Sequence, residues 1–192
     1  MVEYPWYREI DGKEILQQGD FIKDLPIYLP KVSTSEEITA DVLELNVIIL
    51  SQSCDLEHKK ILTVMVCPFK PYSEFVKENS YYGSSDGKKQ LHDSNVIRFH
   101  LLNKCEIEKF KSDFLIVDFS NTFSVPVQYL EKHALKYSER LRLLPPYREQ
   151  LAQNFARFFM RVGLPHNIEN FVEKPKKSEE PGLAVKTSTQ KI

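Results

Sequence analysis

The sequence predicts a mainly β fold with added helices, built as a small β-barrel or a strongly bent sheet. Short apolar runs rich in β-branched residues alternate with polar turns along most of the chain, which is typical of antiparallel strands. A doubly wound parallel sheet needs a helix after nearly every strand, and the pattern lacks those helices. A long polar insertion interrupts the strands, and an amphipathic helix follows the last of them.

The strongest strand signal is the run 42–51, which alternates at first and is continuously apolar in its second half. The polar segment 51–60 separates it from a second apolar run, 61–69, so we expect the two runs to form a hairpin. An earlier strand, 21–25, is expected to end at Pro26, because proline interrupts a strand. The predicted strands span residues 21–25, 42–51, 61–69, 96–102, 114–119 and 140–144.

Helical spacing predicts helices over residues 72–79, 126–136 and 146–162. The last is the clearest, because Pro146 stands in its first turn and Gly163 at the expected C-terminal cap. Its apolar residues fall on one arc and its polar residues on the other. Residues 82–95, rich in glycine, serine and other polar residues, are expected to form a long loop.

Composition limits the compartment and the partners. The chain has 192 residues, 26 of them basic and 27 acidic, so its net charge of −1 argues against a generally basic nucleic-acid binder but allows a local basic face. No apolar stretch is long enough to span a bilayer. Three cysteines without a CxxC pair favour a reducing cytoplasm. No phosphate-binding, dinucleotide or zinc motif is present, so no cofactor is expected.

The same composition predicts one domain with a tail. Residues 1–172, with the helix 146–162, are expected to form a single β-barrel domain, because their apolar content suffices for one core. Residues 173–192 hold no aromatic residue and mix Lys, Glu, Ser, Thr and Pro. Such a segment buries too little apolar surface to order itself, so we expect it to be disordered.

Three short segments follow one another in a fixed order: GDFI from Gly19, VIILS from Val47 and ILTVMVCP from Ile61. In this order they resemble the opening of the PemK/MazF-like toxins, over about residues 15–70. The resemblance implies an SH3-like β-barrel, commonly dimeric, that cleaves single-stranded RNA and is neutralised by an antitoxin, in a prokaryotic toxin–antitoxin or phage-defence setting. The Arg-Pro pair of the family, whose Arg takes part in catalysis, is replaced here by Leu45-Asn46.

Candidate catalytic side chains gather where the best strand ends: Ser51, Cys54, Asp55 and His58. In an endoribonuclease they would line the groove and cleave a phosphodiester without a metal. In a Cys/His hydrolase, Cys54 would be the nucleophile and His58 its base. The structural alternative is a small apolar cysteine at a strand end, with Asp55 capping a turn. The Cys and His spacing matches no zinc pattern, so no metal site is predicted.

The C-terminal third is locally basic. The candidate nucleic-acid contacts are Arg140, Arg142, Arg148, Arg157 and Arg161. The alternative is an ordinary solvated face, because neighbouring glutamates dilute the charge. Arg148 falls near the centre of the apolar arc of the last helix, so we expect it to pair with an aspartate at 20, 24, 55 or 118, or to contact a phosphate.

Three functions therefore compete. The first is a nucleic-acid-binding SH3-like barrel, catalytic or not, whose partner is RNA or DNA. The second is a noncatalytic adaptor that holds a protein, an antitoxin or a larger defence subunit, through its groove or through Phe155, Phe158 and Phe159. The third is the Cys/His hydrolase. The family resemblance adds the expectation of a homodimer.

Overall fold

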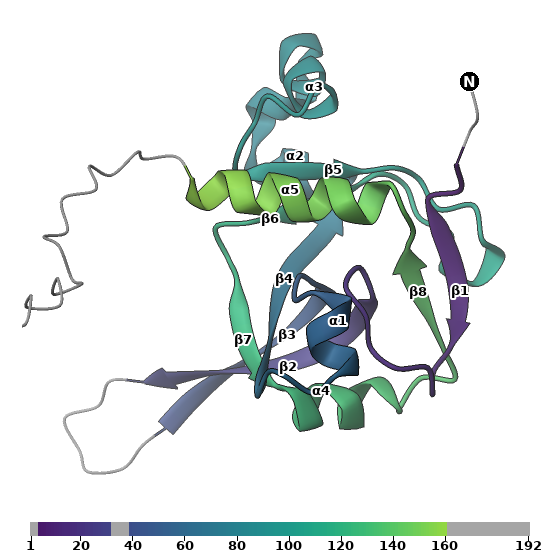
Figure 1. Ribbon diagram of the computed structural model, residues 1–192. Helices are drawn as coiled ribbons and strands as arrows, with labels where there is room; N and C mark the ends of the chain where they lie inside the picture. The colour runs from purple at the N-terminus through teal and green to yellow at the C-terminus, as the bar shows by residue number, and fades with distance from the viewer. Residues whose placement is uncertain (1–3, 32–38, 161–192) are drawn as a thin grey trace, which may run out of the picture. The chain divides into compact units, whose positions relative to one another are not determined.

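The computed structural model describes residues 4–31 and 39–160 and shows a mixed α/β fold with antiparallel sheets and five α-helices (Figure 1). The strands are β1 (Tyr7–Asp11), β2 (Phe21–Lys31), β3 (Thr39–Ile49), β4 (Thr63–Pro71), β5 (Phe99–Leu102), β6 (Leu115–Asp118), β7 (Phe123–Pro126) and β8 (Glu139–Leu143). The helices are α1 (Ser53–Glu57), α2 (Tyr72–Glu78), α3 (Ser85–His92), α4 (Val127–Ala134) and α5 (Tyr147–Phe159).

Strand β4 is the centre of the larger sheet, because it pairs with three neighbours. It pairs with β7 in its first half, with β3 over residues 66–68 and with β6 over residues 69–71. Strand β2 lies beyond β3, and β5 beyond β6. Strands β1 and β8 form a separate pair, which a bridge between Asp20 and Arg142 ties to the start of β2. Within residues 4–31 and 39–160 the sheets do not close into a barrel.

The predicted hairpin between residues 42–51 and 61–69 is confirmed, because β3 pairs antiparallel with β4. Alternate residues of β3 enter two different cores: Ile48 packs with Cys67 and Leu151, whereas Val47 and Ile49 pack on the other face. All three β3 side chains are fully buried. A strand covered on both faces reads as a continuous apolar run, which explains the sequence pattern.

The predicted helices are confirmed as α2, α4 and α5, with shifted ends. Helix α5 buries Leu151 and Phe158 in the core that contains Ile48, as its apolar arc predicts. Phe159, on the edge of that arc, is 61% exposed. The helix ends at Phe159, with Met160 as its C-cap, so the predicted end at residue 162 is too late. The predicted tail, 173–192, lies outside the described residues, and the single domain over 1–172 stays a prediction.

Two predictions about local structure are wrong. Strand β2 does not end at Pro26 but continues through Pro30 to Lys31, because this part of β2 pairs with β3 alone and its other edge needs no N–H group. The expected loop 82–95 contains helix α3, which Ser84 caps by accepting a hydrogen bond from the Gly87 N–H at 3.1 Å.

Two strands were not predicted at all. Strands β1 and β7 are only five and four residues long, too short for a clear period. No helix in the described part of the chain is long and apolar enough to cross a membrane.

Candidate functional site

The first of the predicted catalytic residues, Ser51, has a structural contact. Its Oγ accepts a hydrogen bond from the Met65 N–H at 2.8 Å, and the neighbouring Leu50 N–H donates to the Met65 carbonyl at 2.9 Å. The hydroxyl therefore continues the β3–β4 ladder for one more rung, at the point where the chain turns into α1. This contact joins the two strands, and it occupies the Ser51 hydroxyl oxygen as a hydrogen-bond acceptor.

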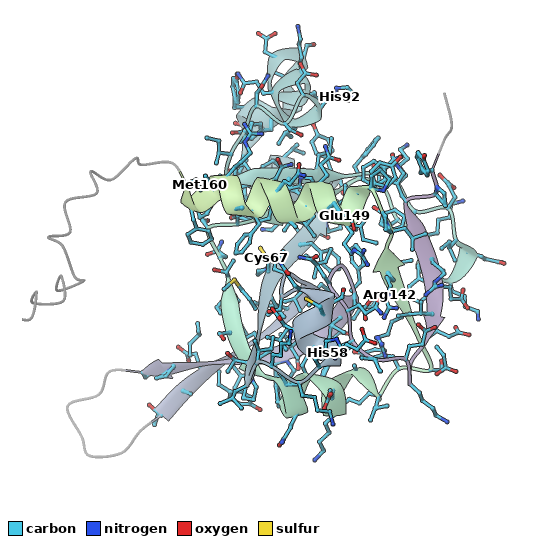
Figure 2. The ribbon with its side chains drawn as sticks, viewed as in Figure 1. His58, Cys67, His92, Arg142, Glu149 and Met160 are labelled. Atoms are coloured by element: carbon cyan, nitrogen blue, oxygen red, sulfur yellow. The ribbon has the colours of Figure 1, made fainter. Side chains whose placement is uncertain are left out.

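The other three predicted catalytic residues lie on and beside α1, but they do not form a catalytic pair. The Cys54 thiol is exposed and lies 3.8 Å from Asp55 Oδ1. His58, labelled in Figure 2, follows the helix. Its backbone N–H donates to the Cys54 carbonyl at 3.1 Å. Among the described residues the His58 imidazole makes no hydrogen bond to the thiol. Nucleophilic catalysis requires such a base within reach, so this arrangement does not favour the hydrolase.

The three cysteines are expected to differ sharply in alkylation by iodoacetamide at neutral pH. Cys54 is expected to react in the folded protein at the rate of an ordinary exposed thiol. Cys67 and Cys105 are buried, and burial raises the pKa of both thiols, so they are expected to react only after unfolding. Peptide mapping by mass spectrometry measures the three rates. Labelling of Cys54 much faster than that of a model peptide would revive the hydrolase.

Two of the predicted nucleic-acid contacts, Arg140 and Arg142, are inside the protein. Each is 3% exposed, and both face Asp20, which is completely buried. Arg142 donates from Nε and Nη2 to the two Asp20 carboxylate oxygens at 2.5 and 2.9 Å. Arg140 lies 3.5 Å from the same carboxylate and donates to the carbonyls of Gly12 and Glu14. These arginines join β8 to the start of β2 and to the segment after β1. Both are almost completely buried, and Arg140 lies in the wall of a groove of about 240 Å³ beside Asn46.

Of the remaining candidate arginines, the structure describes Arg148 and Arg157, which both lie on α5. Arg148 pairs with the adjacent Glu149, at 2.7 Å from Nη2 to Oε1, and not with one of the expected aspartates. The long Arg148 side chain bends along the helix surface and reaches the next residue. The expectation from helical spacing considered only the direction in which each residue leaves the helix. Arg157 is exposed near the end of α5, and Arg161 lies outside the described residues.

A different group of basic and aromatic residues surrounds a groove of about 240 Å³ beside Asn46 of β3. We call it the lysine groove and define it by Lys23, Lys109, Lys111, Phe69, Phe110 and Tyr137, which all line it. Lys109 and Lys111 flank Phe110 on the loop between β5 and β6. Backbone hydrogen bonds of 3.1 Å in both directions between Cys105 and Ser112 close the base of that loop.

A bulge in β2 positions Lys23. The β2–β3 register shifts between Ile22 and Leu25, and Asp24 adopts a left-handed φ of 48°. The Asp24 N–H donates to Asn46 Oδ1 at 3.1 Å. Asn46 therefore holds the bulge in place. Tyr137 supports it from the other side, because its hydroxyl donates to the Lys23 carbonyl at 3.1 Å.

The three lysines differ in how far their charge is already neutralised. Lys109 Nζ lies 2.6 Å from Glu139 and 3.1 Å from Glu9, and these carboxylates raise its pKa. The Lys23 ammonium lies over the Phe110 ring, 5.4 Å from its centroid. Lys111 has no ion pair among the described residues. Lys23 and Lys111 therefore offer their charge to an anion, and Lys109 holds the rim together.

The sequence reasoning missed this groove. The Lys109-Phe110-Lys111 triplet is visible in the sequence, but nothing there links it to Lys23, more than eighty positions earlier. The groove contains no cluster of metal ligands, and no group of three or more His, Cys, Asp or Glu side chains within residues 4–31 and 39–160 is arranged to hold a metal ion.

Helix α5 also bears on the adaptor hypothesis. Of its three phenylalanines, Phe158 is buried and Phe155 packs partly buried against the same core, so only Phe159 presents a largely exposed ring. A docking face built on these three rings is therefore not available on the folded protein.

Compared with protein-family models and with curated proteins, the chain matches none of them.

Proposed function

We propose that this protein binds single-stranded nucleic acid, with RNA as the first candidate, in the lysine groove. The observation that carries the proposal is the convergence of three lysines and three aromatic rings, from β2, β4, the β5–β6 loop and the segment after α4, on one groove. Proteins that bind single strands combine cationic side chains along the phosphates with rings on which bases stack. Because the net charge of the chain is −1, such binding depends on this local concentration of lysines.

The chemistry of the groove supports binding without sequence readout. Each stacked base contributes about 1–3 kcal/mol, and every base has a face that a ring can cover. Phe110 is the ring that we propose for this, because two lysines flank it in sequence. A stacking base would have to displace the Lys23 ammonium, which lies over the ring at 5.4 Å from its centroid. A phosphate beside a stacked base would then meet Lys111, which forms no ion pair within residues 4–31 and 39–160.

We propose binding rather than cleavage as the primary activity. The turn with Cys54 and His58 lacks a nucleophile–base pair, and Asn46 supplies neither an acid nor a base at the position of the family's arginine. An SH3-like, PemK/MazF-type origin of the fold and a toxin–antitoxin or phage-defence setting remain part of the proposal. The order of β2, β3 and β4, with β4 shared between two bent halves of the sheet, supports this origin.

Binding of a fluorescent single-stranded RNA, followed by anisotropy, tests the proposal. Phe110→Ala is expected to weaken binding by about 5- to 150-fold, the equivalent of one lost base stack. Lys111→Ala is expected to weaken it more mildly and to reduce the slope of log K against log salt by about 0.7, the value for one phosphate contact on a single strand. Thermal melts confirm that each variant is folded.

Lys132→Ala is the matched control, because Lys132 is an exposed lysine on α4 that does not line the groove. It is expected to change neither affinity nor salt slope. Equal binding by wild type, Phe110→Ala and Lys111→Ala would overturn the proposal. RNA cleavage by wild type that disappears in a Cys54→Ala/His58→Ala variant would instead establish the endoribonuclease.

A further inference from the structure

We propose that a second copy of this chain pairs with the outer edge of β3, so that two β2–β3 arms form one continuous four-stranded sheet. The arm is the part of the hairpin, residues 25–31 and 39–45, in which β2 and β3 pair only with each other among the residues that the structure describes. Figure 1 shows it extending away from β4. Its exposed apolar side chains are Tyr28, Leu29, Val42 and Leu43.

The hydrogen bonds at the base of the arm determine which backbone groups face outward. The Ile49 N–H donates to Asp20 and its carbonyl accepts from Gly19, so Ile49 faces β2. The Leu50 N–H donates to Met65 of β4, on the opposite side. Because backbone groups alternate along an antiparallel strand, Ala40, Val42 and Glu44 direct their N–H and C=O groups to the free edge.

The same alternation places Pro26, Tyr28 and Pro30 on the outer edge of β2, opposite Glu44, Val42 and Ala40 in the register. The two prolines lack N–H groups, and the Pro26 carbonyl already accepts a hydrogen bond from the Tyr129 hydroxyl at 2.7 Å. Prolines protect an edge strand against pairing. The arm therefore has one protected edge and one open edge, and the open edge is β3.

The charges of β3 select how two copies pair. If the two-fold axis passes through Val42, Ala40 of one copy lies opposite Glu44 of the other. The outward N–H and C=O groups of Ala40, Val42 and Glu44, six on each copy, then all find a partner. An axis at Asp41 or at Glu44 would place identical carboxylates directly opposite each other, which is destabilising. An axis at Leu43 would require pairing at Asn46, next to the point where β4 takes over this edge at Val47.

A groove of about 390 Å³ borders the arm. Leu43 and Leu45 of β3 line it together with Phe69 and Ile116 and with polar residues that include Arg98 and Asp118. Val42 is 53% exposed and Leu43 39% exposed, so pairing removes apolar surface from water on both copies. A second copy is self-complementary here, because the same strand, with the uncharged Val42 at the axis, faces itself.

Two opposite charges at position 42 test the register. The full-length wild type is expected to be a concentration-dependent dimer by light scattering. Val42→Lys and Val42→Asp are each expected to raise the dissociation constant roughly a hundredfold or more, because like charges would meet at the axis. An equimolar mixture of the two variants is expected to dimerise again, because position 42 then faces its opposite charge.

Leu62→Lys is the control, because Leu62 is 89% exposed and lies away from the arm, in the turn before β4. It is expected to dimerise like wild type. A wild type that stays monomeric at all concentrations overturns the proposal, as does a Val42→Lys variant that dimerises unchanged. Failure of the two variants to associate when mixed overturns the axis at Val42.

Discussion

Replacing Asp20 with alanine is expected to lower the free energy of unfolding by about 3–5 kcal/mol, because two buried arginines would lose their shared counter-ion. Arg142 would keep the Glu14 carboxylate, at 3.2 Å, and the Ile15 carbonyl, at 2.8 Å, and Arg140 would keep its carbonyl contacts. The Asp20 carboxylate also accepts the Gln17 N–H at 3.1 Å, so the turn that starts β2 would loosen as well. A loss of this size is a large part of the stability of a small domain.

Urea unfolding of the wild type and of Asp20→Ala measures this loss. Asp113→Ala is the matched control, because Asp113 forms an exposed pair with Lys104 at 3.6 Å and such pairs contribute about 1 kcal/mol or less. A double variant, Asp20→Leu/Arg142→Leu, is expected to be more stable than the sum of the two single losses predicts. If Asp20→Ala loses no more than Asp113→Ala, the buried cluster does not hold the fold.

The fate of Arg140 and Arg142 shows where sequence reasoning stops. Their alternation with leucines correctly predicts strand β8, and the usual rule then assigns the arginines to solvent. The rule fails because both faces of this strand are covered. Leu141 and Leu143 pack in the core that contains Ile48. On the other face, Asp20, more than 120 positions away in the sequence, lies against both arginines. A buried charge is recognisable only once its partner is in place.

Local sequence patterns were sufficient to predict structure where the signal lies within a single strand or helix. The hairpin of β3 and β4 and the burial of Cys67 follow from apolar runs, and helix α5 from its periodicity. The lysine groove instead needs the bulge at Asp24, the loop around Phe110 and Tyr137 after α4 to meet in space. No periodic pattern in the sequence predicts that these three segments lie side by side, so the candidate site could be found only from the structure.

Acid is expected to destabilise the fold through His100. His100 belongs to β5 and is 3% exposed. Asn154 Nδ2, on α5, donates to His100 Nδ1 at 2.8 Å, so the proton of the neutral imidazole is on Nε2. Nε2 is buried without a hydrogen-bond partner in the described structure. Burial lowers the pKa of His100 to about 4 from the 6.5 of an unfolded histidine.

The sign of the effect follows from where the proton binds. Below pH 6.5 the unfolded chain takes up a proton at His100, whereas the folded chain stays neutral until about pH 4. The stabilising contribution is therefore complete above pH 6.5 and is lost as the pH falls from 6.5 to 4, by about 3 kcal/mol in total. The Arg98–Asp118 pair adds to this at lower pH, because its hydrogen bonds lower the pKa of Asp118.

Unfolding free energies measured at steps from pH 7 to pH 4.5 test this expectation in the wild type and in His100→Phe. The variant is expected to be less dependent on pH over this range by about one proton, a slope of about 1.4 kcal/mol per pH unit at most. His92→Phe is the control: the His92 side chain is 83% exposed, so replacing it is expected to leave the slope as in wild type. Identical slopes for wild type and His100→Phe would show that His100 is not the buried group responsible for the loss of stability in acid.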